Sequence, residues 1–420
     1  MNSGGGRYSA EKTITKILIW NKIIISSHQQ FQKTIFMKPT TITKLILSLL
    51  LLVAASNVAC NKAQSSQSEI TTITISDKEK ISPDQFLDSH RLVRLSPTKT
   101  PVGEIEKTII TDKYIILVDN EQANTIFVFN HKGEILSEIC RLGRGPQEYT
   151  FIQDVALLDY KGQEAIAVAD SRQEKLLLYT IDGKYINSIE YLFDFDNIVQ
   201  SGSKSWLCLT SGDNQKSDAF KERNDGNSLL VFTDSDMKIK STTMPSPFER
   251  VNFVTPDIAT NAKEVLITPQ FQDTVYRVEN CTITPAYRID LAEFGGVTNT
   301  NDWSTDKIIA DFDSFVHIYN LYEAKNNVII NAVTKNSFIN TYIYNKASSK
   351  TYRLDGERTT SFAELNVYDV CATYKDEFAV IIDAVTIEEY NQEFPDQAVM
   401  KDIKDSDNPV IMFFTMKKEF

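Results

Sequence analysis

One stretch of the sequence recurs about 50 residues further along the chain. YIILVDNEQANTIFVFNHKGEILSEI (114–139) aligns with EAIAVADSRQEKLLLYTIDGKYINSI (164–189), which places Asp119 over Asp170. Each copy contains an apolar strand that ends in an aspartate, a second β-rich strand, a short turn with glycine and a third strand. A period of this length is typical of one blade of a β-propeller.

Weaker copies of the same pattern follow at 206–241, 264–290, 327–354 and 377–416. Short strands at steady spacing, with almost no helical periodicity, favour a closed ring of six units over a sandwich. The last unit lacks an outermost strand, which either LVRL (92–95) or ITTITI (70–75) can supply. We therefore predict an all-β fold over residues 70–420: a six-bladed β-propeller of four-stranded antiparallel blades, with an N-terminal strand closing the last blade.

The N-terminus carries an export signal ahead of this ring. Lys38 and Lys44 precede the apolar run LILSLLLLVAA (45–55), which is short for a transmembrane helix. Small residues then lead directly to Cys60. The arrangement resembles a bacterial lipoprotein signal, which implies that Cys60 is lipidated and becomes the mature N-terminus. Cleavage near Ala59 without lipidation is the alternative.

Three segments follow from this signal. Residues 1–59 form the signal region, with Met37 as the expected true start. Residues 60–69 are polar and of low complexity, so we expect a flexible tether between the anchor and the propeller. No acidic residue directly follows the cysteine, in contrast to known surface-exported lipoproteins. We therefore expect an outer membrane-anchored lipoprotein that faces the periplasm.

The charge of the mature chain excludes one class of partner. Without the first 59 residues the chain keeps 37 basic and 55 acidic side chains, a net charge of about −18, and no basic cluster. Such a surface repels phosphate backbones, so nucleic acid is not expected. We expect a monomer that binds a glycan, a peptide or an envelope protein and meets the membrane through its lipid anchor only.

The mature chain has four further cysteines: Cys140, Cys208, Cys281 and Cys371. Each lies in or beside a predicted strand, and no CxxC spacing occurs, so buried free thiols are expected. Oxidation of a pair in an exported chain stays open.

Loop lengths separate the two faces of the predicted ring. In a four-stranded blade, the loops between the second and third strands and those between blades emerge on one face. The three long insertions, 212–227, 291–313 and the helix-like 384–408, all fall on that face, whereas turns on the other face are brief. Variable loops on a rigid scaffold commonly carry ligand sites, so we expect the functional surface here, around the mouth of the central channel.

Several motifs point to a known family. GRGPQEY (143–149) after the first blade, the VDN and VAD strand ends, and PQFQDTVY (269–276) resemble the six-bladed β-propeller lipoproteins of Gram-negative gut bacteria, relatives of NHL-type propellers. The resemblance covers roughly residues 70–420, with Gln147 in place of the glycine commonest in the motif. It implies the fold and a place in the cell envelope, but most members have no assigned function.

The candidate ligand-binding residues on this face are Arg144, Glu148, Tyr149, Asp119, Asp170, Gln270, Asp273 and Trp303. In GRGPQEY the glycines permit positive φ, Pro146 sets a turn and Tyr149 can pack under the next blade. Arg144 and Glu148 can instead reach the channel mouth, where the planar guanidinium could hold a carboxylate or sugar hydroxyls. Both interpretations can hold together.

The other candidates also have two interpretations. Asp119 and Asp170 each end a strand, where an aspartate commonly accepts hydrogen bonds from the following backbone amides. Ligand contact is the alternative. Trp303, in the longest connection between blades, could stack on a sugar or aromatic ligand, or pack its insertion on the ring.

The sequence shows no catalytic pattern. The mature chain has only His90, His131 and His317, without metal-ligand spacing, and it lacks a GxSxG elbow, a Walker loop and a DxDxDG calcium loop. We nominate no catalytic residue, no metal ligand and no cofactor. The expected function is a lipid-anchored binding or scaffold module. The alternative is a metal-dependent lyase or lactonase-like enzyme with a divalent ion in the channel, as in some NHL-like propellers.

Overall fold

The computed structural model describes residues 70–202, 205–210, 214, 216–245, 257–260, 265–269, 271–279, 281–298, 314–334, 339–355 and 359–420. The chain divides into two units, Met1–Ser66 and Gln67–Phe420. The first unit, the predicted signal, Cys60 and the tether lie outside the described residues. All the elements below belong to the second unit.

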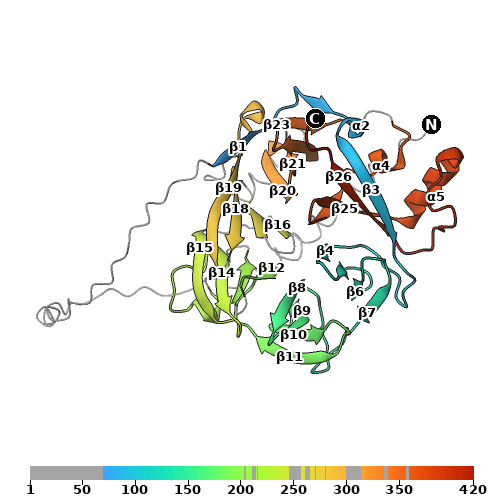
Figure 1. Cartoon of the computed structure of the whole chain (residues 1–420). Helices are drawn as coiled ribbons and strands as arrows, with labels where there is room; N and C mark the ends of the chain where they lie inside the picture. Colours follow the sequence, from blue (N-terminus) through green and yellow to red (C-terminus); the bar gives the residue numbers. More distant parts are fainter. Residues whose placement is uncertain are drawn as a thin grey trace, which may run out of the picture. The chain divides into compact units, whose positions relative to one another are not determined.

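The second unit is an all-β ring of six blades, as predicted, and therefore a β-propeller (Figure 1). The main strands of each blade are antiparallel neighbours, labelled A to D from the centre outwards. Blade 1 consists of β4 (Lys107–Ile110), β5 (Ile115–Asp119), β6 (Thr125–Phe129) and β7 (Ile135–Ile139). Blade 2 consists of β8 (Asp154–Tyr160), β9 (Gln163–Asp170), β10 (Lys175–Thr180) and β11 (Tyr185–Glu190). Blade 3 consists of β12 (Asn197–Gln200), β13 (Ser205–Leu209), β14 (Ser228–Asp234) and β15 (Ile239–Pro245).

The second half of the ring repeats this order. Blade 4 consists of β16 (Asp257–Thr260), β17 (Val265–Thr268), β18 (Thr274–Glu279) and β19 (Thr282–Asp290). Blade 5 consists of β20 (His317–Glu323), β21 (Asn327–Val333), β22 (Ile339–Asn345) and β23 (Lys350–Leu354). Blade 6 takes β24 (Val370–Tyr374), β25 (Glu377–Ile382) and β26 (Val410–Met416) from the C-terminus and β3 (Leu87–Arg94) from the N-terminus. The short helices are α2 (Pro83–Phe86), η1 (Asp218–Phe220), η2 (Ala292–Phe294), α4 (Phe362–Leu365), α5 (Ala384–Glu393) and η4 (Pro395–Gln397).

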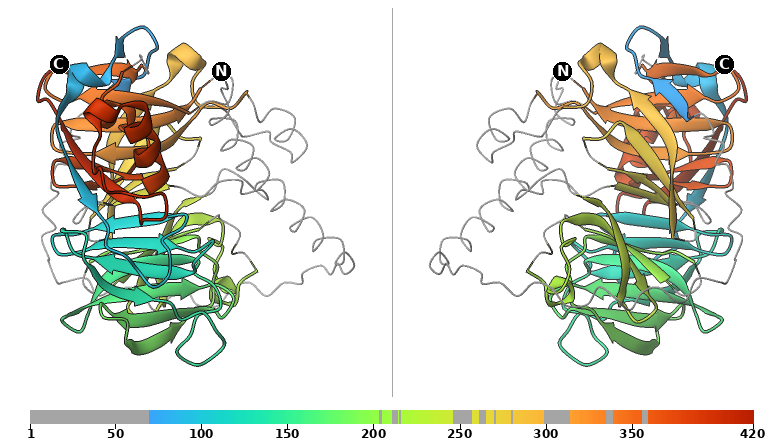
Figure 2. Two further views of the ribbon diagram at one scale, coloured as in Figure 1. Left: turned by 90° about the vertical axis from the view of Figure 1, so that its right-hand side faces the viewer. Right: turned by 90° about the vertical axis from the view of Figure 1, so that its left-hand side faces the viewer.

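The N-terminal strand closes the ring. β3 pairs antiparallel with β26, from Arg94 opposite Val410 to Leu87 opposite Met416. Figure 2 shows β3 in blue beside the red strands of the last blade. Of the two predicted closing segments, the one that contains LVRL is therefore correct, and its strand begins earlier than the motif does.

The other segment has a different place. β1 (Thr71–Thr74) pairs parallel with β19, and β2 (Lys80–Ile81) pairs parallel with β23, so blades 4 and 5 each gain a fifth strand. The interpretation of ITTITI as the closing strand is wrong. Ile73 and Ile75 are buried in the core between blades 4 and 5. Their burial holds this segment on the edge of blade 4 and away from blade 6.

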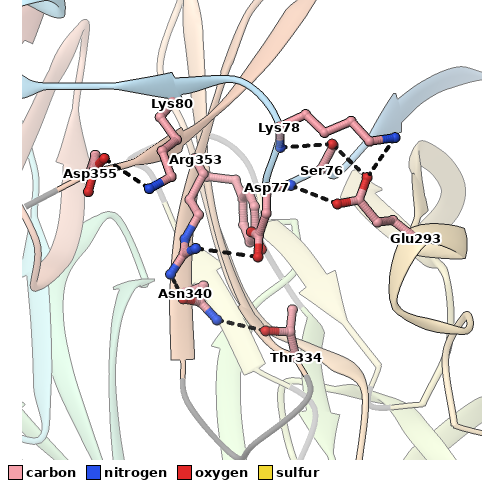
Figure 3. Close-up of polar contacts among 10 residues, drawn as sticks. Ser76, Asp77, Lys78, Lys80, Glu293, Thr334, Asn340, Arg353 and Asp355 are labelled. Carbon is pink, nitrogen blue, oxygen red and sulfur yellow. Dashed lines mark hydrogen bonds and ion pairs between the residues drawn. The ribbon is translucent and has the colours of Figure 1, made fainter.

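Polar contacts hold the turn between β1 and β2 on the same two blades (Figure 3). Ser76 Oγ donates to Glu293 Oε2 of the blade 4 connection at 2.7 Å. Asp77 accepts a hydrogen bond from the Tyr342 hydroxyl at 2.9 Å and pairs with Arg353 at 3.3 Å, both from blade 5. The N-terminal segment thus joins the outer edges of neighbouring blades before it closes the ring.

The core consists of apolar layers between the blades. Each of six buried clusters of described residues lies between two neighbouring blades. On β5, Ile115 and Leu117 belong to the cluster shared with blade 6, while Ile116 and Val118 belong to the cluster shared with blade 2. Because neighbours cover both faces of the sheet, such strands are continuous apolar runs rather than alternating ones.

Replacing Ile73 tests the fastening of the N-terminal segment. Ile73→Ala leaves a cavity between blades 4 and 5, so we expect the free energy of unfolding to fall by about 2–5 kcal/mol. Thr72→Ala, at an exposed position of the same strand, should change it by less than about 0.5 kcal/mol. Urea denaturation measures both, and equal effects would contradict the burial of the isoleucine face.

Candidate functional site

The strand order shows that the connections with the three long insertions begin and end on one face, which we call the loop-rich face. Residues 212, 213, 215 and 299–313 of these insertions lie outside the described residues. The connection after β13 joins strands B and C of blade 3, and that after β25 joins strands B and C of blade 6. The connection after β19 joins blade 4 to blade 5. Loops of both kinds leave a propeller on the same face. The GRGPQEY segment, which joins β7 to β8, shares this face.

The GRGPQEY segment folds back on itself. The Gly143 amide donates to the Tyr149 carbonyl at 2.9 Å, and the Gly145 amide donates to the Glu148 carboxylate at 2.8 Å. Neither glycine has a positive φ, so the expectation of left-handed backbone is wrong here. Space is the reason for glycine instead, because a Cβ on Gly143 would lie 2.0 Å from Glu148 Oε2. Glu148 therefore stabilises the folded-back segment by accepting a hydrogen bond from within it.

Tyr149 packs between blades 1 and 2, as the structural interpretation predicted. Its hydroxyl donates towards the carbonyls of Asn124 and Ile139, at 2.7 and 2.8 Å, and accepts from the Arg141 amide at 3.0 Å. Burial raises the pKa of Tyr149 well above its usual value. The side chain is inaccessible to solvent and holds the joint between the two blades rather than a ligand.

Asp119 organises the loops at the end of β5. Its buried carboxylate accepts hydrogen bonds from the amides of Gln122 and Ala123, both at 2.8 Å, and from the Gly103 amide at 3.0 Å. Gly103 belongs to the connection from blade 6 to blade 1. One carboxylate therefore ties two neighbouring loops together.

Asp170 does the same for the next blade. It accepts from the Thr150 amide at 2.6 Å, from the Arg172 amide at 3.0 Å and from the Gln173 side chain at 2.7 Å. Asp170 is also fully buried. The interpretation of both aspartates as acceptors for backbone amides agrees with these contacts, which leave neither carboxylate exposed to a ligand.

The remaining predicted residues have different surroundings. Arg144 is exposed and has no hydrogen-bond or ion-pair partner among the described residues. Gln270 and Trp303 lie outside the described residues. Asp273 follows β17 on the loop-rich face and accepts a hydrogen bond from Arg288 Nε at 2.8 Å.

Asp273 lines an open cavity of about 730 Å³ on blade 4. Its walls come from β1, from the start of β18, from the end of β19 and from the connection that follows. Sequence reasoning missed Tyr276 and Arg288, which also line it. Arg288 is an ordinary strand residue in the sequence, and no motif contains it. Tyr276 is the last residue of PQFQDTVY, a motif that indicates the family but no ligand contact. The cavity wall that contains Arg288 forms only because β1 pairs with β19, and the sequence does not show this pairing.

Two further groups lie at the starts of inner strands. Lys107 pairs with the buried Asp154 at 2.8 Å, and Asp154 also accepts from the Ile198 amide at 2.8 Å, which joins blades 1, 2 and 3. His317 begins β20 and lies 5.0 Å from the ring of Phe271. Burial lowers the pKa of His317 to about 4, so its imidazole is neutral near pH 7.

All four described cysteines are free thiols. Cys208 is buried and Cys371 partly buried, but Cys140 and Cys281 are exposed, which corrects the expectation for those two. Cys140 directly follows outer strand β7, and Cys281 lies in the turn before β19, so neither enters a core layer.

The described residues contain neither a candidate metal centre nor a helical membrane span. No three side chains of His, Cys, Asp or Glu gather there in an arrangement that could hold a metal ion. No helix in that part of the chain has the length and apolar character needed to cross a membrane.

The fold and these sites define a β-propeller whose long connections share one face. The chain belongs to the DUF4934 family, described as a domain of unknown function, whose model matches residues 68–415. It is similar to the structure of a putative exported protein from Bacteroides fragilis NCTC 9343, with 17% identity over 83% of this chain and 100% of that chain and a TM-score of 0.64. This likeness shows the fold.

A second solved structure is less similar. A member of the duf4221 family from Bacteroides vulgatus has 9% identity over 79% of this chain and 97% of its own, with a TM-score of 0.48. A comparison with curated proteins finds no match.

A pair of variants separates the structural and exposed parts of GRGPQEY. Tyr149→Phe removes the hydroxyl that contacts three backbone groups, so we expect the free energy of unfolding to fall by about 1–3 kcal/mol. Arg144→Ala should change it by less than about 0.5 kcal/mol. Denaturant titration measures both, and a neutral Tyr149→Phe would refute the structural role of the hydroxyl.

Proposed function

We propose that this protein is a binding or scaffold module of the cell envelope, whose loop-rich face holds a glycan, a peptide or a partner protein. The polar residues Asp119, Asp170 and Glu148 are engaged in holding loops, as the described hydrogen bonds indicate. The part of the face left for a ligand is therefore the exposed surface of the connections themselves.

The distribution of exposed apolar side chains carries this proposal. Among the described residues, seven large apolar side chains are exposed. Five of them lie in or next to connections of the loop-rich face: Leu142, Leu192, Ile339, Leu365 and Val385. Single exposed apolar residues are normal on any protein. Their concentration on the face that also carries the long connections is what an interaction surface requires.

We do not extend the proposal to the lyase or lactonase alternative, because no observation on the described residues favours it. Elemental analysis of the purified protein and its activity after chelation remain the direct test of that alternative.

A double variant tests the interaction face. Leu142→Asp with Leu192→Asp places two charges on exposed positions of the loop-rich face, at side chains that are 54% and 58% exposed. We expect cross-linking of the protein to its envelope partner, measured by quantitative mass spectrometry, to fall at least about tenfold, because a buried charge without a partner disfavours an apolar contact.

Leu136→Asp is the matched control. Leu136 is 47% exposed and lies on outer strand β7, near the turn on the opposite face. This variant should keep the partner. Loss of the partner in the control alone would show that the interaction face is misplaced, and failure of the wild-type protein in glycan, peptide and envelope-protein screens would refute the proposed function.

We further propose that Cys60 anchors the protein to the outer membrane, with the propeller facing the periplasm. The signal and tether in the sequence support this location. The similar protein from Bacteroides fragilis is described as a putative exported protein, which agrees with export.

Replacement of Cys60 tests the anchor. Cys60→Ala should abolish metabolic labelling with palmitate and move the protein from the membrane to the soluble periplasmic fraction, because the acyl chains supply the membrane affinity. Cys140→Ala, which removes an exposed thiol of the propeller, should change neither result. A wild-type protein cut near residue 59 and free of label would contradict the anchor, and protease sensitivity on intact cells would contradict the periplasmic side.

A further inference from the structure

We propose that the cavity on blade 4 is a binding site for a neutral saccharide. This inference rests on the proposed function, since it names the ligand class of one part of the loop-rich face. The cavity measures about 730 Å³, within the range of ligand sites in proteins. All of its lining residues belong to the described part of the chain.

A row of side chains on three strands forms one wall. Thr72 on β1 and Thr274 on β18 both pair with Arg288 on β19, so the three side chains lie side by side on the same face of the sheet. Their neighbours Ile73 and Ile289 point to the other face and are buried between blades 4 and 5. The polar row is therefore held by a rigid apolar layer behind it.

The Arg288 guanidinium is held through Nε, and its other nitrogens are available as hydrogen-bond donors. Its Nε donates to Asp273 Oδ2 at 2.8 Å, and the other oxygen of Asp273 accepts from the Thr274 hydroxyl at 2.8 Å. The terminal nitrogens of Arg288 have no partner among the described residues, and the side chain is 60% exposed. A guanidinium fixed at Nε presents the remaining donors of its planar fork to a ligand.

The other lining residues supply a hydrogen-bond acceptor and an aromatic surface, which a sugar requires in addition to donors. Asp290 accepts from the Ala292 amide through Oδ1 at 2.9 Å, and its other oxygen lies 3.4 Å from the Thr74 hydroxyl, so that oxygen keeps most of its accepting capacity. The ring of Tyr276 adds a partly exposed apolar surface. Sugar hydroxyls both donate and accept, and sugar rings stack on aromatic faces.

Charge decides between a neutral and an anionic ligand. The lining holds one guanidinium and two carboxylates, those of Asp273 and Asp290, so its net charge is negative. The whole chain is also acidic. A carboxylate or phosphate would meet net repulsion, whereas an uncharged polyol uses both kinds of group. Hydroxyl-rich neutral saccharides fit this lining better than acidic sugars or acidic peptides.

Titration calorimetry on the full-length chain tests the site. The probes are neutral trisaccharides of glucose, mannose, galactose and xylose, together with a glucuronate-containing trisaccharide and an acidic tetrapeptide. We expect at least one neutral trisaccharide to bind. Arg288→Ala and Tyr276→Ala should each weaken that binding about tenfold or more, because a charged hydrogen bond or a stacking surface is lost.

Lys132→Ala is the control for a general effect of removing an exposed cation, because Lys132 lies in the turn between β6 and β7 on the opposite face. It should leave the dissociation constant within about twofold. The unfolding midpoint of Arg288→Ala should stay near that of the wild type, because its ion pair is solvent-exposed. Lost binding with an unchanged midpoint therefore reports on the site and not on folding.

The results that overturn the inference differ from those that overturn the proposed function. Saccharide binding that is indifferent to Arg288→Ala and Tyr276→Ala would reject this cavity, and binding of only the glucuronate or peptide probe would reject the neutral class. Binding of none of the probes would reject the saccharide itself. In all three cases the cross-linking comparison of the leucine variants still decides whether the loop-rich face binds a partner.

Discussion

Face-to-face packing of apolar sheets is the interaction on which the whole propeller depends. Each blade has apolar side chains on both faces, and each of the six buried clusters belongs to two blades at once. A single blade could not bury both faces, so the blades are stable only with a neighbour on each side. The ring must close for every blade to have two neighbours, and β3 from the N-terminus closes it.

Ring packing also determines which polar residues remain for function. The joints between blades need fixed loops, and the residues that fix them are those that the motifs display most clearly: Asp119, Asp170, Glu148 and Tyr149. The aspartate recurs at equivalent positions of blades 1 and 2, since equivalent joints pose the same hydrogen-bonding problem. The proposed binding function is left to the less regular connections, where exposed leucines and the blade 4 cavity occur.

The candidate site was predictable only where local chemistry specified it. Asp119 and Asp170 end apolar strands, and an aspartate at that position accepts from the next amides whatever the rest of the fold does. The reason for Gly143 was not predictable. A side chain at this position would collide with the folded-back Glu148 carboxylate, whereas the backbone torsion itself does not require glycine. Arg288 and Tyr276 were missed because alternation in a strand shows which side chains share a face but not what lies opposite them.

The sequence by itself determined the number of blades, the order of their strands and the face from which the long connections leave, because apolar periodicity and turn residues act over a few neighbouring positions. Tertiary structure alone decided which N-terminal segment closes blade 6 and which extends blades 4 and 5. Both segments have the alternation of a strand, and their partners lie some 200 to 330 residues away, so only the assembled ring distinguishes them. The same long-range pairing of β1 with β19 brings Thr72 beside Arg288 and builds the wall of the cavity.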